Sequence, residues 1–439
     1  MQSLRAGAAA VNISPHDSQF LFGYPHVERY STGIHDPLFS SCLYLSDSTT
    51  DLMFIANDII FVGKDSAQRA RARIEQETGV RSEHIMITAT HTHSGPITVD
   101  YLSNADDPIV PKRDPAYVRL LEDGIVSAAT AAFDGVRPAE IGLAVADGTG
   151  IGTNRRDPTG PADPQVPVLM VRDTAARNPI ACMVAYSMHP TVLHEDSTLV
   201  SADFPGFTRR YIQQQLLGQD CPVLYHTGPA GNQSPRHVTH SNTFEEAERL
   251  GVMLGERIGA VLPSLKYSSH MSLRTARRLV DLPRKTFPTV EEAERTLAHT
   301  RQRLESLRSA GAARQDVRTA EVDWFGAEET LTLARAALDG RVDTQYQACL
   351  PAEIQVLGVG DWMFVGWPGE IFVEYALKVK TRFDHAFIVS MANGELQGYI
   401  VTEEAAAEGG YEASNGLFPP ASGHVLIETT MELLQSLAR

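Results

Sequence analysis

The sequence predicts a layered α/β/α-type catalytic fold with a mixed sheet and a helical hairpin insert. Three observations indicate this class. Short apolar runs typical of buried strands alternate with helical patterns over the first two thirds of the 439 residues. Hydrophobic residues make up 43% and charged residues 21%, which excludes disordered, collagen-like and coiled-coil classes. No apolar run approaches the ~18 residues that a membrane-spanning helix needs.

The predicted strands and helices follow from the local pattern of apolar residues. A strand is expected where a short run is almost continuously apolar, and a helix where apolar residues recur every three or four positions. Strands are therefore predicted at 52–60, 84–90, 166–171, 181–186, 223–226, 352–359, 362–367 and 386–391, and helices at 64–77, 115–133, 243–262 and 371–381.

Residues 289–340 have a different character. Apolar residues recur near heptad spacing from Val290 to Leu307 among many Arg and Glu, and a Gly-Ala break separates them from a second such pattern. This arrangement predicts a helical hairpin that serves as a packing insert rather than as a lid or a dimer arm. We expect one catalytic domain over 1–439, with the hairpin insert at 285–342.

The charge balance limits the partners of this chain. It has 38 Lys and Arg against 54 Asp and Glu, a formal net charge of −16, which disfavours nucleic acid and anionic membrane surfaces. The start of the chain lacks the apolar core of a signal peptide, and its four cysteines are widely scattered. We therefore expect a cytoplasmic protein with buried free thiols and no stable membrane insertion. The sequence leaves open whether the chain forms a homo-oligomer. The cysteines are Cys42, Cys182, Cys221 and Cys349.

The strongest local signal is a hydrophobic strand that runs into His91-Thr92-His93 and then a Gly-Pro turn. In extended backbone, residues two apart point to the same face, so both imidazoles are expected at one edge of the sheet. Neutral imidazole is a good zinc ligand. An isolated His-x-His pair is nevertheless more often a pair of surface or core histidines.

Three further strands also end in residues that can bind a metal. His189 follows the strand at 181–186, Glu370 follows 362–367, and Tyr399 follows 386–391. Each has an alternative interpretation. Glu370 comes after Pro-Gly and suits the first turn of a helix, and a Gly-Tyr pair after a strand commonly serves turn formation and packing.

Several enzyme classes are excluded by their motifs. The chain has no nucleophile elbow, phosphate-binding P-loop, HExxH or complete GxGxxG, and Ser94-Gly95 follows His93 where a metallo-β-lactamase needs Asp and His. The Gly-rich stretch 148–152 is expected to be a loop. A two-metal barrel amidohydrolase, which also begins from His-x-His at a strand end, remains an alternative.

Taken in order, these motifs resemble the catalytic domain of the neutral/alkaline non-lysosomal ceramidases. The resemblance extends over essentially the whole chain. The matching stretches are GIHDPL at 33–38, THTHSGP at 90–96, TNRR at 153–156, MHPT at 188–191, GNQSP at 231–235, PGE at 368–370, GY at 398–399 and GYEAS at 410–414.

This resemblance implies a zinc-dependent amidohydrolase that cleaves the amide bond of a small N-acyl molecule. It places the ligands of a single Zn²⁺ at His91, His189, Glu370 and Tyr399. It places His93, Arg155 and Tyr411 against the substrate amide as catalytic residues. Asp58 and Asp203 are candidate hydrogen-bond partners of the metal-bound imidazoles, as such rings usually require.

Departures from the family pattern shape the expected substrate. Asn232 stands where the family has aspartate, and the chain ends soon after the last motif, without the C-terminal β-domain of ceramide-hydrolysing members. We therefore expect an N-acyl substrate other than ceramide itself. The alternatives are a zinc esterase or lactonase that uses the same site, and a purely structural metal site. Ser234 is expected to cap a helix rather than to act as a nucleophile.

Overall fold

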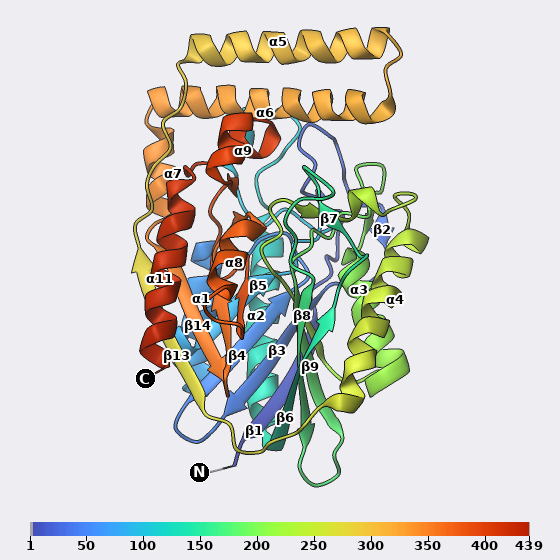
Figure 1. The fold of residues 1–439 in the computed structure, drawn as a ribbon, viewed down its shortest axis with the longest axis vertical. Helices are drawn as coiled ribbons and strands as arrows, with labels where there is room; N and C mark the ends of the chain where they lie inside the picture. The colour runs from blue at the N-terminus through green and yellow to red at the C-terminus, as the bar shows by residue number, and fades with distance from the viewer. Residues whose placement is uncertain (1–2, 439) are drawn as a thin grey trace.

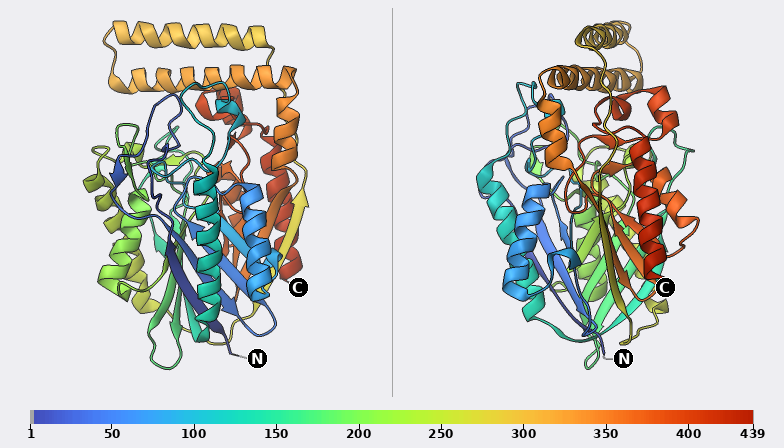
Figure 2. Two further views of the ribbon diagram at one scale, coloured as in Figure 1. Left: turned by 180° about the vertical axis from the view of Figure 1, so that it is seen from behind. Right: turned by 90° about the vertical axis from the view of Figure 1, so that its left-hand side faces the viewer.

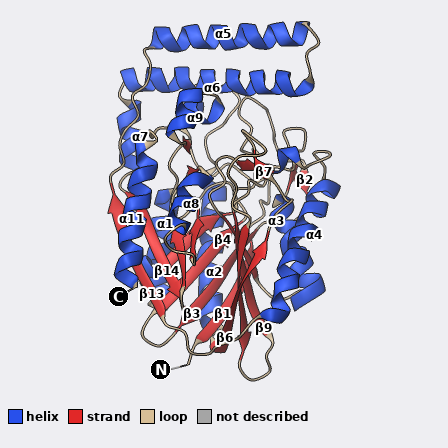
Figure 3. Ribbon diagram, in the orientation of Figure 1, coloured by secondary structure: helices blue, strands red, loops and turns tan. Residues whose placement is uncertain are grey.

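The computed structural model describes residues 3–438, in which helices flank two facing β-sheets (Figures 1 and 3). The larger sheet has the order β11-β9-β8-β6-β1-β3-β4-β5. Its outer pairs β4–β5 and β9–β11 are parallel and the inner pairs are antiparallel. Its strands are β1 (Arg5–Asn12), β3 (Phe39–Ser46), β4 (Asp51–Asn57), β5 (Ile85–Ala89), β6 (Arg137–Asp147), β8 (Gln165–Asp173), β9 (Pro179–Tyr186) and β11 (Val223–Thr227).

A second, four-stranded sheet lies against the first. It has the order β13-β14-β15-β17, and a shared core joins the two sheets. Within that core the rings of Phe54 and Phe364 pack edge to face, with their centroids 5.4 Å apart. The strands are β13 (Leu273–Val280), β14 (Ala352–Val359), β15 (Trp362–Gly366) and β17 (Ala386–Val389).

Helices cover the outer face of each sheet (Figure 2). α1 (Lys64–Thr78) and α2 (Pro115–Asp134) pack on one half of the larger sheet, and α3 (Asp203–Tyr211) and α4 (Phe244–Val261) on the other. α2 begins where its sequence indicates, because the Asp114 carboxylate accepts from Ala116 N and Pro115 occupies the first turn. The smaller sheet is covered by α8 (Val373–Lys380) and α11 (Ala421–Leu437).

The predicted layered α/β fold with a mixed sheet is confirmed. Every strand and helix that the apolar pattern predicted is present, with small differences in its bounds. The smaller sheet adds a layer, so the order is helices, sheet, sheet, helices. Three two-stranded ribbons lie at the edge where the site forms: β2 (Gly33–Ile34) with β10 (Leu199–Val200), β7 (Thr153–Asn154) with β12 (Gln233–Ser234), and β16 (Glu370–Ile371) with β18 (Tyr399–Ile400).

Two antiparallel helices project from this body. α5 (Val290–Ser309) begins at a capping box between Thr289 and Glu292, and it packs on α6 (Arg314–Leu338), which separates it from the sheets (Figure 1). The assignment of one domain with an insert at 285–342 stays a prediction. Shorter helices are α7 (Arg341–Cys349), α9 (Glu403–Glu408) and α10 (Tyr411–Ser414). Among the helices of residues 3–438, none combines the length and the apolarity needed to cross a bilayer.

Glu329 on α6 predicts a dependence of stability on pH. Its side chain is 2% exposed, and burial raises its pKa from 4.5 to about 7. Because the folded state holds this proton more tightly than the unfolded state, stability falls as pH rises from about 4.5 to 7. At about 1.4 kcal/mol per pKa unit, the loss is about 3.5 kcal/mol.

Glu329→Gln removes this titration, so its free energy of unfolding relative to wild type is expected to rise between about pH 5 and pH 8 in denaturant titrations. Glu305→Gln, on the exposed side of α5, is the control and should show no such change. A constant difference between Glu329→Gln and wild type across this pH range would contradict the assignment.

Candidate metal centre

Loops and strand ends from both sheets meet at one edge of the molecule. His91 follows β5 and His189 follows β9, both in the larger sheet. Glu370 comes after β15 of the smaller sheet and begins β16, where it lies directly opposite Tyr399 of β18. His91 and Tyr399 are 308 positions apart in the chain, yet they reach the same region of the molecule.

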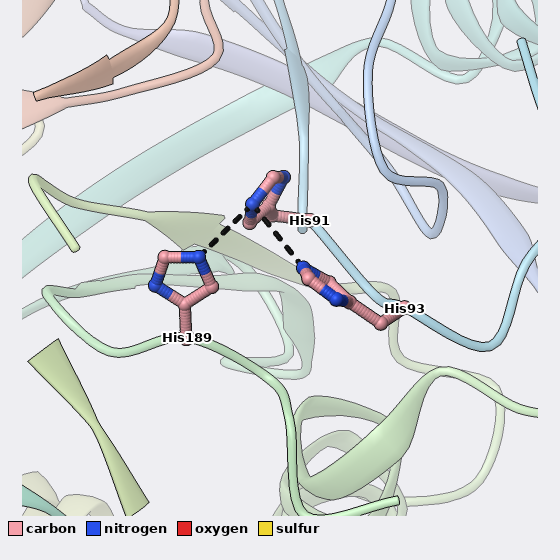
Figure 4. A group of neighbouring side chains, drawn as sticks. All are labelled: His91, His93 and His189. Carbon is pink, nitrogen blue, oxygen red and sulfur yellow. Dashed lines mark hydrogen bonds between the residues drawn. The ribbon is translucent and has the colours of Figure 1, made fainter. Parts of the chain in front are cut away.

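The atoms that could bind a metal are close together (Figure 4). His91 Nε2 lies 3.2 Å from His189 Nε2 and 3.5 Å from His93 Nε2. Glu370 Oε2 is 3.1 Å from His189 Nε2 and 3.2 Å from His91 Nε2. The three imidazoles are buried, and together they could hold a metal ion.

The backbone around His91 differs from the extended strand that the sequence predicted. β5 ends at Ala89, and His91 has a φ of 68°, in the left-handed region that few residues other than glycine adopt. The two imidazoles of His91 and His93 therefore meet because the chain turns, and the expectation from strand alternation was wrong. A strained backbone of this kind persists only where surrounding contacts hold it, and such positions cluster at functional sites.

Backbone carbonyl groups fix the protons of two of the imidazoles. Nδ1 of His91 lies 2.9 Å from Ile60 O, and Nδ1 of His189 lies 2.5 Å from Ala230 O. Each Nδ1 therefore carries the ring proton, and each Nε2 presents a lone pair to the cluster.

The expected partners Asp58 and Asp203 do not fill this role. The Asp58 carboxylate binds Phe39 N and Arg209, and the Asp203 carboxylate accepts from Leu193 N and Phe204 N. Asp203 instead lies in the first turn of α3.

The charges of the cluster suit a bound cation. Burial lowers the pKa of His189 to about 4 and that of His93 well below its ordinary value, so both rings are neutral near pH 7. Burial opposes ionisation of Glu370, whereas a positive charge on the side of the carboxylate where His91 and His189 lie lowers its pKa well below its usual range. Lone pairs and a carboxylate thus face one another in a buried space, an arrangement that a divalent cation would stabilise.

His93 occupies a more exposed edge of the cluster and differs from the other two imidazoles. Its Nδ1 has no hydrogen-bond partner within residues 3–438. Its ring packs edge to face on Tyr24, with centroids 5.3 Å apart. The His93 ring also lies against the backbone of Gly23, which leaves room for it because a Cβ at that position would lie 2.5 Å from His93 Cγ.

The remaining predicted site residues lie beside this cluster. The Tyr399 ring centroid is 6.4 Å from that of His189 and 6.0 Å from that of Tyr411. The guanidinium carbon of Arg155, which follows β7, is 5.1 Å from the Tyr399 ring centroid. Burial raises the pKa of both Tyr399 and Tyr411 well above 10, so without a cation both phenols are protonated.

Several groups that hold the imidazoles of the site in place were not predicted from the sequence. The carbonyl groups of Ile60 and Ala230 belong to the backbone, so no sequence motif reveals them. Gly23 gave no signal by itself. Ser234 was predicted as a cap, and its hydroxyl accepts from Arg236 N at the start of a short 3₁₀ helix.

Comparison with known proteins identifies similar chains. Residues 6–224 match the family model described as neutral/alkaline non-lysosomal ceramidase, N-terminal. A neutral ceramidase from Mycobacterium tuberculosis (strain ATCC 25618 / H37Rv) is 25% identical over 243 residues, which are 50% of this chain and 37% of that protein. The chain thus matches a little over a third of the length of this curated relative.

Solved structures share the fold. The crystal structure of neutral ceramidase from Pseudomonas aeruginosa superposes with a TM-score of 0.77 at 19% identity, covering 100% of this chain and 75% of that one. A ceramidase complexed with C2 gives a TM-score of 0.76 at 17% identity, covering 100% and 76%. At these identities the likeness establishes the architecture.

We expect the purified protein to bind one equivalent of a divalent metal ion and to lose thermal stability when a chelator removes it. An ion present at 100 times its Kd stabilises the folded state by about 2.7 kcal/mol. Metal analysis and thermal melts with and without chelator measure both effects. His189→Ala should abolish them, whereas His299→Ala, on exposed α5, should not. Full metal content in His189→Ala would contradict this centre.

Proposed function

This chain belongs to the neutral/alkaline non-lysosomal ceramidase family, and from that membership we propose that it is a zinc-dependent hydrolase that cleaves the amide bond of an N-acyl compound. One observation carries the proposal: Nε2 of His91, Nε2 of His189 and Oε2 of Glu370 lie within 3.2 Å of one another. Such a set of neutral imidazoles and a carboxylate is typical of catalytic zinc sites.

In this proposal His91, His189, Glu370 and Tyr399 hold one Zn²⁺. Zinc, when bound, supplies Lewis acidity, which polarises a carbonyl group and lowers the pKa of water. The Tyr399 phenol would bind as a phenolate, because a neighbouring cation lowers a pKa that burial otherwise raises. Metal-bound imidazoles almost always donate their second N–H, as His91 and His189 do.

His93 is assigned a role in proton transfer rather than in metal binding. It is close enough to be a third nitrogen ligand, but its Nδ1 has no acceptor in the described part of the chain, unlike those of His91 and His189. Its neutral ring would accept a hydrogen bond at Nε2 from the attacking water. The leaving amine would take its proton from the same nitrogen.

Arg155 and Tyr411 would stabilise the negative charge that develops on the substrate carbonyl oxygen. Arg155 remains charged, since Tyr399 and Glu412 raise its pKa against the effect of burial. The high pKa of Tyr411 keeps its hydroxyl protonated and able to donate. Loss of one such donor typically costs about 10²–10³ in rate.

The proposed substrate is an N-acyl compound more soluble than ceramide. The net charge of −16 supports this, because an acidic protein is repelled by anionic lipid surfaces. Cytoplasmic location belongs to the same proposal.

Hydrolysis assays on matched substrates test the reaction. We expect the zinc-loaded protein to release acid from a short-chain N-acyl amide with a higher kcat/KM than from ceramide in detergent micelles, since a dispersed molecule needs no lipid surface. An ester with the same acyl chain distinguishes an esterase or lactonase. Ester cleavage without amide cleavage would contradict the amidase assignment, and comparable rates on ceramide would overturn the substrate assignment.

Gly23→Ala tests the placement of His93. A Cβ at this position would lie 2.5 Å from the ring, and the φ of 126° is unfavourable for alanine. We expect kcat for the N-acyl amide to fall by roughly 10²-fold, in the range expected for His93→Ala. Gly218→Ala is the matched control, because Gly218 has a φ of 99° and no neighbour within 4 Å of its Cβ position. Equal activity of the two variants would refute this role of Gly23.

A further inference from the structure

Arg155 carries a hydrogen-bonding group that other contacts of the fold do not use. The side chain is 15% exposed, and its Nη2 meets no acceptor in the part of the chain that the structure describes. An arginine has many rotamers, so a donor of this kind needs an external contact that fixes its direction. Arg155 N donates to Asn232 O at 2.7 Å, which fixes the backbone, and the guanidinium lies beside Tyr399, with its carbon 5.1 Å from the ring centroid.

Glu412 supplies the contact that fixes the side chain. One carboxylate oxygen accepts from Arg155 Nε at 2.8 Å, and the other accepts from Arg156 Nη1 at 3.0 Å. The Glu412 side chain is 11% exposed, and the two arginines hold its pKa below the ordinary value although burial opposes this. Because the carboxylate binds Nε, the guanidinium is oriented with Nη2 still available.

Glu412 is also the neighbour of Tyr411 in α10, and this short helix has several supports. Thr330 Oγ1 of α6 lies 3.2 Å from Ser414 O, and Lys285 Nζ donates to Ala413 O at 2.6 Å. A Cβ on Gly326 of α6 would be 3.4 Å from Tyr411 Cα, so the two helices are in close contact. α10 therefore presents a phenol and a carboxylate from a fixed position.

We propose that Glu412 is a positioning residue that holds Arg155 with Nη2 free for the substrate carbonyl oxygen, so that α10 sets both proposed oxyanion donors together. This inference rests on the proposed function. Arg156 completes the arrangement: it neutralises the second carboxylate oxygen and is itself bound by Glu408 Oε2 at 2.9 Å. Without Arg156, the buried Glu412 carboxylate would lose one of the two positive charges that offset the cost of its burial.

Glu412→Gln, which keeps the size of the side chain, tests the proposal in the zinc-loaded full chain. For the N-acyl amide we expect kcat to fall by about 10- to 100-fold with KM within about threefold, because the donor acts on charge that develops during the reaction. In an Arg155→Met background the same substitution should lower kcat by less than about threefold, since Glu412 acts through Arg155. Zinc content should stay at one equivalent.

Glu408→Gln is the matched control, since this carboxylate also binds Arg156 but its side chain is 69% exposed. It should leave kcat unchanged. Equal losses from Glu412→Gln in the wild-type and Arg155→Met backgrounds would show a merely structural role and overturn the proposal. So would an unchanged kcat in Glu412→Gln.

Calorimetric binding of hexanoate, an acid product, separates this proposal from the proposed function. We expect Glu412→Gln to weaken hexanoate binding by about tenfold in the wild-type background and not in Arg155→Met. If the wild-type protein cleaves no amide but shows this coupling, the proposed function fails and the positioning role stands. Equal hexanoate affinity in Glu412→Gln and wild type overturns the positioning role.

Discussion

The structure of the site depends on the repulsion among electron-rich atoms buried side by side. His91 and His189 present lone pairs to each other and to the Glu370 carboxylate at distances of 3.1–3.2 Å. In water such groups would separate or bind protons, but the carbonyl contacts of both rings and the low pKa of His189 prevent this. The fold therefore has to hold these donors in place at a cost, and a cation removes that cost.

Other features of the fold serve this arrangement. The left-handed backbone at His91 turns the ring out of the path of β5, and the parallel pairing of β16 with β18 sets Glu370 opposite Tyr399. Each of these features is unfavourable or neutral for an isolated segment. Strained backbone of this kind clusters at functional sites, which agrees with a metal centre at this edge of the two sheets.

The fold was predictable wherever burial leaves a continuous apolar run. β4, β5 and β9 are central or tightly covered, and their sequences show it. β13 was not predicted, because it lies at the edge of its sheet and its sequence, LRTARRLV, carries three arginines. β1, with the sequence RAGAAAVN, is dominated by alanine, whose preference for strands is weak. The second sheet depends on contacts between distant segments, which a local pattern cannot encode.

His91, His189, Glu370 and Tyr399 stood out after predicted strands, whereas their assignment as ligands and the roles of His93, Arg155 and Tyr411 came from the resemblance to the ceramidase family. The contacts that orient these side chains were not predicted. The partners of the imidazoles are backbone carbonyl groups, which every residue possesses, so the aspartates Asp58 and Asp203 were the only candidates that side-chain chemistry offered. Glu412 lies 257 positions from Arg155 in the chain, and the resemblance to the family indicated its neighbour Tyr411 rather than Glu412. Orientation of a side chain is a property of packing, which the order of residues reveals only in part.

Because the donor side chains come from segments next to both sheets, a metal ion held by them would link metal binding to the association of the two sheets. His91 and His189 follow strands β5 and β9 of the larger sheet. Glu370 and Tyr399 lie in the β16–β18 ribbon, which follows strands β15 and β17 of the smaller sheet, and the Phe54–Phe364 contact joins the two sheets. By thermodynamic reciprocity, an ion shared by both sheets strengthens their association as much as their association strengthens its retention. Loosening of the aromatic core between the sheets would therefore lower the affinity for the ion, even with every ligand unchanged.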